Sequence, residues 1–66
     1  MTFVVQSRED ILPAIKKLRN GEQIICPPYF LRTLEEQASK AGLRLLRDDF
    51  GWGYEIRALG GKNAAY

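Results

Sequence analysis

The sequence predicts a single small α+β domain, a two-layer sandwich of βαβαββ order with two helices on one face of a four-stranded mixed sheet. Two segments with helical apolar spacing alternate with four short segments that favour strands. Glycine or proline stands at most of the boundaries between these segments. Right-handed crossovers between the strands would bring both helices to the same face of the sheet.

The first half of the chain predicts a strand, a helix and a second strand. Residues Thr2–Gln6 and Glu22–Cys26 are short and apolar, as in buried strands. Between them, Ser7–Asn20 carries a helical apolar face made by Ile11, Ala14, Ile15 and Leu18. Pro13 costs little only within the first helical turn, so we expect Asp10 to be the N-cap after a looser turn. Gly21 suits the left-handed residue that ends a helix.

The second half predicts a helix followed by a hairpin. Pro27-Pro28 starts a helix that runs to about Ala41 and stops at Gly42, and its apolar stripe is Phe30 or Leu31, then Leu34, Ala38 and Ala41. Strands follow at Leu43–Arg47 and Tyr54–Leu59, with a turn over residues 48–53. We expect residues 1–59 to form the domain and residues 60–66 to form a flexible C-terminal tail.

Composition excludes several classes of function. The 66 residues carry a net charge of +2, which is too weak to identify a nucleic-acid binder by itself. The chain has no His, the commonest metal ligand and acid–base group, and its single Cys26 has no partner for an internal disulfide. With no signal peptide in evidence, we predict a cytoplasmic, non-enzymatic protein without cofactor or metal.

The hairpin is the best candidate for a working surface. Its strands alternate so that Tyr54, Ile56 and Ala58 face the helices, which leaves Leu46 and Leu59 on the outer face among charged residues. Such leucines mark either a bulged edge or an interface. Trp52 either covers the rim of the core or anchors a partner. The candidate partner-binding residues are Arg44, Leu46, Arg47, Trp52, Tyr54, Arg57 and Leu59.

Basic residues support an alternative, nucleic-acid binding, with phosphate contacts from Lys16, Lys17, Arg19, Arg44 and Arg57. The three on the first helix stand near its C-terminal end, where cations also favour the helix dipole. Asp48 and Asp49, with Asp10 or Glu55, match no metal-loop spacing and predict no metal site.

The order of elements resembles that of small bacterial sulfur-carrier proteins, whose activity depends on a Cys-Pro-x-Pro motif at the start of the first helix. This chain has Asp10-Ile11-Leu12-Pro13 there, without a cysteine, so the resemblance covers topology only. Cys26 ends an apolar strand just before a helix. That position is typical of a core residue, and the alternative is a reactive thiol near a helix N-terminus.

Protein–protein recognition through the hairpin and the outer sheet face is therefore the leading hypothesis. A compact accessory or inhibitor protein, of the kind that bacteria and their phages encode, would suit the size of the chain. The partner is either another protein or a second copy of the chain, because an open face with two leucines favours pairing.

Overall fold

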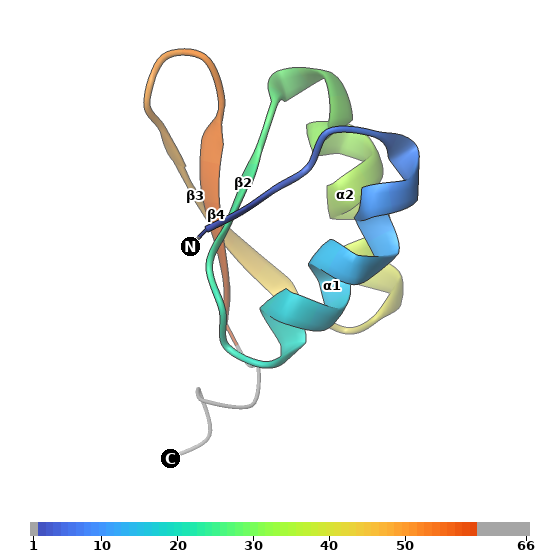
Figure 1. Ribbon diagram of the computed structural model, residues 1–66. Helices are drawn as coiled ribbons and strands as arrows, with labels where there is room; N and C mark the ends of the chain where they lie inside the picture. Colours follow the sequence, from blue (N-terminus) through green and yellow to red (C-terminus); the bar gives the residue numbers. More distant parts are fainter. Residues whose placement is uncertain (1, 60–66) are drawn as a thin grey trace.

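Two helices cover one face of a four-stranded sheet in the computed structural model, which describes residues 2–59 (Figure 1). Met1 and the predicted tail at 60–66 lie outside the described residues. The elements are β1 (Phe3–Val4), the 3₁₀ turn η1 (Arg8–Asp10), α1 (Ile11–Arg19), β2 (Ile24–Cys26), α2 (Pro28–Lys40), β3 (Arg44–Asp49) and β4 (Tyr54–Leu59). The predicted α+β two-layer sandwich is confirmed.

The sheet is open and mixed, with strand order β1-β2-β4-β3. β1 runs parallel to β2, while β4 is antiparallel to both β2 and β3. The crossover through α1 moves the chain by one position, and the crossover through α2 moves it by two. Because both move in the same direction, a right-handed path puts both helices on one face. β4 then occupies the position between β2 and β3, so β3 is an edge strand.

The start of α1 agrees with the interpretation of Pro13. The expected looser turn is η1, and α1 begins at Ile11, directly after Asp10. Pro13 is then within the first turn, where backbone N–H groups have no helical partner to lose. The Asp10 carboxylate does not cap its own helix. It accepts a hydrogen bond from the backbone N–H of Gln6 at 2.8 Å, which links the segment after β1 to the residue before α1.

Each helix ends at a glycine with positive φ, as predicted. At the end of α2, Gly42 has φ 78° and the N–H of Leu43 donates to the carbonyl of Ala38 at 2.8 Å. At the end of α1, Gly21 has φ 87°. This conformation reverses the chain and directs the next strand back along the helix layer.

The core fills the space between the helices and the covered face of the sheet. All four apolar residues predicted for α1 are buried, and so are Leu31, Leu34 and Ala38 of α2. The sheet contributes Ile24, Cys26 and Ile56 at full burial. No buried side-chain polar atom among the described residues lacks a hydrogen-bond partner. Within residues 2–59, neither helix is long and apolar enough to cross a bilayer.

The hairpin differs from its predicted boundaries. β3 begins one residue later than expected and continues to Asp49, two residues beyond the predicted end at Arg47. The turn is correspondingly shorter, because the N–H of Phe50 still donates to the carbonyl of Gly53 at 3.1 Å. Asp48 and Asp49 have typical turn composition, but Asp49 uses its carboxylate to bind the N–H of Gly51 at 2.9 Å. The turn therefore begins after Asp49, and both aspartates belong to the strand.

Candidate interaction surface

The outer face of the sheet carries side chains that alternate with those of the core. Across β3 and β4 the outer pairs are Arg44 with Leu59, Leu46 with Arg57, and Asp48 with Glu55. The Asp48–Glu55 pair continues onto Ile25 of β2 and Val4 of β1. Apolar and charged residues of both signs therefore share one continuous face.

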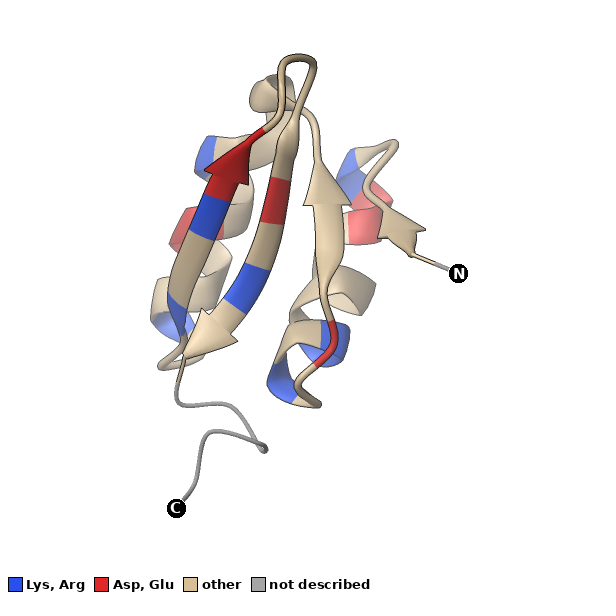
Figure 2. Ribbon diagram, turned by 90° about the vertical axis from the view of Figure 1, so that its left-hand side faces the viewer, with Lys and Arg blue, Asp and Glu red and all other residues tan. Residues whose placement is uncertain are grey.

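No element in the described part of the chain covers this outer face. Figure 2 shows the open sheet toward the viewer, with the helices behind it. Leu46 is 43% exposed and Leu59 is 44% exposed, as expected for outward-facing residues. The regular register through both residues excludes a bulge as their explanation. Two large apolar side chains are thus presented on a face that no element within residues 2–59 covers.

The charges of the outer face are incompletely paired. Asp48 stands directly opposite Glu55, and like charges in this position destabilise a sheet. Glu55 accepts a hydrogen bond from Gln23 Nε2 at 2.8 Å, but no described residue offers Asp48 an ion pair. Arg44 and Arg57 likewise form no ion pair within residues 2–59. These groups are available to a binding partner.

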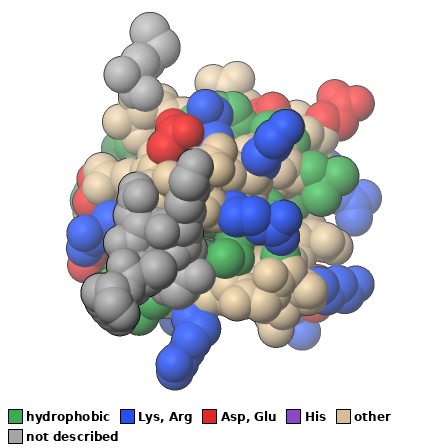
Figure 3. All heavy atoms as spheres, turned by 90° about the horizontal axis from the view of Figure 1, so that it is seen from below, with side chains coloured by type: hydrophobic (Ala, Val, Ile, Leu, Met, Phe, Trp, Pro, Cys, Tyr) green, Lys and Arg blue, Asp and Glu red, His purple; other side chains and the backbone are tan. Residues whose placement is uncertain are grey.

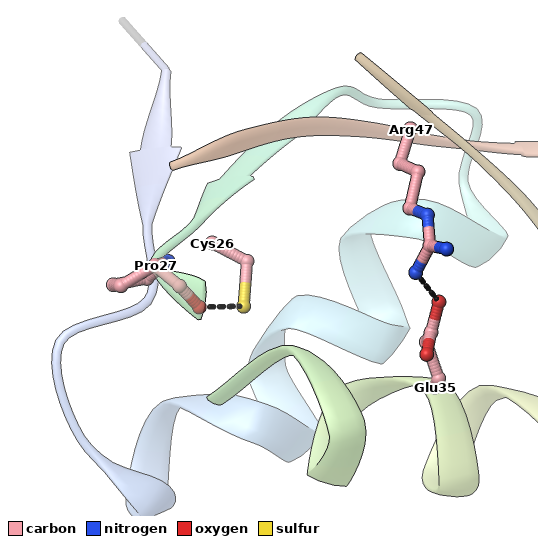
Figure 4. A network of polar contacts seen from close by, with 4 residues as sticks. All are labelled: Cys26, Pro27, Glu35 and Arg47. Atoms are coloured by element: carbon pink, nitrogen blue, oxygen red, sulfur yellow. Dashed lines mark hydrogen bonds and ion pairs between the residues drawn. The ribbon is translucent and has the colours of Figure 1, made fainter. Parts of the chain in front are cut away.

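Arg47 and Tyr54, both predicted as partner-binding residues, lie on the other face of the hairpin. Arg47 reaches from β3 to α2, where its Nη1 donates to Glu35 Oε2 at 2.6 Å (Figure 4). Its guanidinium also lies 5.9 Å from the centre of the half-buried Tyr54 ring. These two side chains fix the hairpin to the helix layer. The structure does not group them with Leu46, Arg57 and Leu59.

Trp52 stands at the tip of the hairpin and does not cover the core. It is 60% exposed, and its ring packs edge-to-face on Phe50 with centroids 4.9 Å apart. The tip is held by Gly53, which is buried: a Cβ there would come within 3.2 Å of the Cys26 carbonyl oxygen. Trp52 is therefore presented to solvent at one end of the outer face.

The predicted basic set is divided between two regions. Lys16, Lys17 and Arg19 lie on the last turns of α1. Lys17 is already engaged, 3.7 Å from Glu22 and 5.5 Å from the centre of the Phe3 ring. Arg44 begins β3 at the same end of the molecule, where Figure 3 shows several Lys and Arg side chains. Arg57 belongs to the sheet face instead.

Cys26 is a buried core residue. Burial, aided by the negative charge of Glu35, raises the pKa of its thiol from 9.0 to about 11. Its Sγ lies 3.4 Å from the Pro27 carbonyl oxygen, which accepts the thiol hydrogen (Figure 4). A protonated, enclosed thiol is the opposite of the exposed thiolate that nucleophilic or carrier chemistry uses.

Residues 2–59 contain no group of three metal-ligating side chains. Asp48 and Asp49 are adjacent in β3 and so point to opposite faces of the sheet. Asp10 is occupied by the N–H of Gln6. Of the acidic residues considered from the sequence, only Asp48 and Glu55 are brought together, and no third ligand joins them among the described residues.

Sequence reasoning missed a shallow hollow beside the start of α2. Its volume is about 390 Å³, and it is lined by Arg8, Tyr29, Phe30, Arg32 and Thr33. Tyr29 is 85% exposed and packs edge-to-face on Phe30. The available signal was a tyrosine off the apolar stripe of its helix. Val4 and Ile25 were also missed on the outer face, because their strands read as continuous apolar runs.

Comparison with protein-family models gives no match, and no curated protein or solved structure is found to be similar to this chain.

Proposed function

We propose that this chain is a cytoplasmic, non-enzymatic protein-binding module of the accessory or inhibitor type, whose recognition surface is the outer face of the sheet. The observation that carries the proposal is the outer face, which no described element covers and on which Leu46 and Leu59 alternate with Arg44 and Arg57. Apolar contact area combined with unpaired arginines is typical of protein interfaces.

The exposed Trp52 at the hairpin tip supports the same proposal. Tryptophan and arginine dominate the residues that contribute most to binding at protein interfaces. Trp52 adjoins the outer face at the end where Asp48 and Glu55 lie. We therefore expect a protein that binds the outer face to contact Trp52 as well.

Leu46→Glu tests the proposal, with Leu12→Glu as the matched control. Leu12 is 70% exposed on α1, in the helix layer, so both substitutions place the same charge at an exposed leucine. The immobilised chain is exposed to a lysate of its source cells, and retained proteins are identified by mass spectrometry. We expect Leu46→Glu to lose specific proteins that Leu12→Glu still retains. Equal retention by both variants would contradict the proposal.

The second candidate function is nucleic-acid binding at the end of the molecule where α1 terminates and β3 begins. The basic residues on the last turns of α1 favour it, and Figure 3 shows Lys and Arg side chains at several separate places on this end. Binding of a fluorescent single-stranded oligonucleotide should then weaken steeply with salt and respond to Arg19→Ala. No binding at low ionic strength would eliminate this candidate. Salt also distinguishes the two candidates, because the affinity of an apolar-centred protein interface depends only weakly on salt.

A further inference from the structure

Among the strands of residues 2–59, β3 has one edge without a pairing strand. It is an outermost strand of the sheet and is six residues long, whereas β1 at the opposite edge has two residues. A long exposed edge offers unpaired N–H and C=O groups to another strand. Charged residues occupy four of its six positions, so any strand that pairs with it must satisfy those charges.

The hairpin determines which backbone groups are free. The N–H of Phe50 donates to Gly53, on the β4 side. Backbone N–H and C=O groups of successive strand residues point to opposite edges of the strand. Those of Asp48, Leu46 and Arg44 therefore also point toward β4. The N–H and C=O groups of Leu45 and Arg47 therefore point outward from the sheet. They are ready to bond to a neighbouring antiparallel strand.

A second copy of β3 fits this edge in one register. Antiparallel neighbours place side chains of the same face opposite each other, so Arg44, Leu46 and Asp48 must meet one another. With Leu46 opposite Leu46 of the second copy, Arg44 stands opposite Asp48 of the second copy, and the symmetry repeats that pair. The same register pairs Leu45 with Arg47 of the second copy, which joins the free backbone groups of both strands.

The neighbouring registers lack this complementarity. A shift that puts Leu45 opposite Leu45 of the second copy places Arg44 against Leu46 and leaves Asp48 unpaired. A shift in the other direction places Arg47 against Arg47 of the second copy, and like charges in that position repel. The charge pattern of β3 therefore selects one two-fold arrangement out of those that keep the sheet faces aligned.

We propose that two copies of this chain associate through antiparallel pairing of their β3 strands, with the two-fold axis at Leu46. This dimer rests on the proposed function, because it names a second copy of the chain as the partner that binds the recognition surface at β3. The two four-stranded sheets become one sheet of eight strands, with all four helices on one face. Arg44 of the second copy also supplies the positive charge that Asp48 lacks beside Glu55.

The contact is isologous, so it closes after two copies and does not grow into fibres. Arg47 contributes its backbone at the edge while its side chain is held toward Glu35 on the helix face. An interface built on a single six-residue strand is small, and we expect a dissociation constant on the order of 10 µM.

Charge exchange tests the register directly. Arg44→Asp and Asp48→Arg should each replace two attractive pairs with two repulsive ones and weaken self-association by about tenfold or more. A mixture of the two variants should form heterodimers, because each then carries the charge that the other needs. The double variant Arg44→Asp/Asp48→Arg should dimerise with itself. Arg19→Asp, with the same charge change on α1, should dimerise like the wild type.

Sedimentation equilibrium from about 5 µM to about 500 µM gives the masses. A wild type that stays monomeric would overturn the proposal. Single variants that still dimerise, or a mixture of the two that stays monomeric, would overturn it as well. Folding of each variant is checked by circular dichroism. If a variant fails to fold, amide hydrogen exchange of the wild type decides. The N–H groups of Leu45 and Arg47 should become protected as concentration rises, and constant rapid exchange of both would overturn the dimer.

The outcomes separate this inference from the proposed function. A monomeric wild type that nevertheless loses captured proteins on Leu46→Glu removes the dimer and leaves the recognition surface in place. A monomer that captures nothing removes both proposals.

Discussion

The two faces of this sheet differ in composition although the same strands build them. The covered face carries Ile24, Cys26 and Ile56, all fully buried against the helices. The outer face carries Leu46 and Leu59 at nearly half exposure, beside arginines and carboxylates without ion pairs among the described residues. A sheet with one solvated face normally alternates apolar with polar residues. Here the solvated side retains apolar residues that the fold itself does not use.

Stability and recognition are assigned to different faces of the sheet in this chain of 66 residues. A domain of this size buries only about 60% of its unfolded surface, so it has few residues to spare from its core. The covered face, with α1 and α2, supplies that core. Substitutions on the two faces should therefore separate into effects on folding and effects on association.

The largest effect should come from Leu34→Ala on α2, which leaves a cavity where a fully buried side chain packs. We expect a loss of about 3 kcal/mol in the free energy of unfolding. Leu46→Ala on the outer face should cost less than about 1 kcal/mol. Urea denaturation at low micromolar concentration, where self-association is minimal, measures both. Equal losses would contradict the distinction between the two faces.

The next effect concerns Cys26 on the covered face. Its folded pKa of about 11 lies above its ordinary value of 9.0, so the fold favours the protonated thiol. This contribution is complete below pH 9.0 and is lost as the pH rises to about 11. Its size is on the order of 2 kcal/mol.

Denaturation of the wild type and of Cys26→Ala at pH 8 and at about pH 11 isolates that contribution, because other titrating groups are common to both proteins. The wild type should lose more stability than the variant. In the folded protein at neutral pH, the thiol should also resist iodoacetamide and react only on unfolding. Rapid alkylation of the native protein would show that Cys26 is accessible.

A smaller effect is expected at Gly53, where the hairpin meets β2. A methyl group there would stand 3.2 Å from the Cys26 carbonyl oxygen, a backbone atom that cannot turn aside. Gly53→Ala should therefore destabilise the fold by about 1 kcal/mol. The thermal midpoint measures it. An unchanged midpoint would mean that the hairpin is less closely attached to β2 than the structure shows.

The smallest effect should come from the ion pair between Arg47 and Glu35, which links the hairpin to α2. The distance is 2.6 Å, but both side chains are about half exposed, so solvent screens their attraction. A double-mutant cycle with Arg47→Ala and Glu35→Ala should give a coupling below about 1 kcal/mol. A much larger coupling would make this pair a principal support of the hairpin.

The sequence predicted the covered face better than the outer one. The buried face of α1 recurs at helical spacing, at Ile11, Ala14, Ile15 and Leu18. This periodicity is a property of one helix, so it can be recognised without knowing the neighbouring elements. Leu46 and Leu59 were placed outside by strand alternation alone, which the structure confirms. Val4 and Ile25 were not, because their strands read as apolar throughout and the face of each residue depends on the neighbouring strand.

The position of Arg47 could not be read from the sequence. Its partner Glu35 is 12 residues away and belongs to another element, so only the packing of β3 on α2 brings them together. The strand end at Asp49 was missed for a related reason. Aspartates favour turns in general, and the pairing of Asp49 with Tyr54 that extends the strand is a property of the folded hairpin.

The pairing of two copies through the edge of β3 is tested most directly by amide chemical shifts in a dilution series. Spectra of the wild type are recorded from about 20 µM to about 1 mM, a range that spans the expected dissociation constant. We expect concentration-dependent shifts along β3 and at Arg57 and Leu59, with α1 unchanged. Shifts confined to the helices, or none at any concentration, would contradict it.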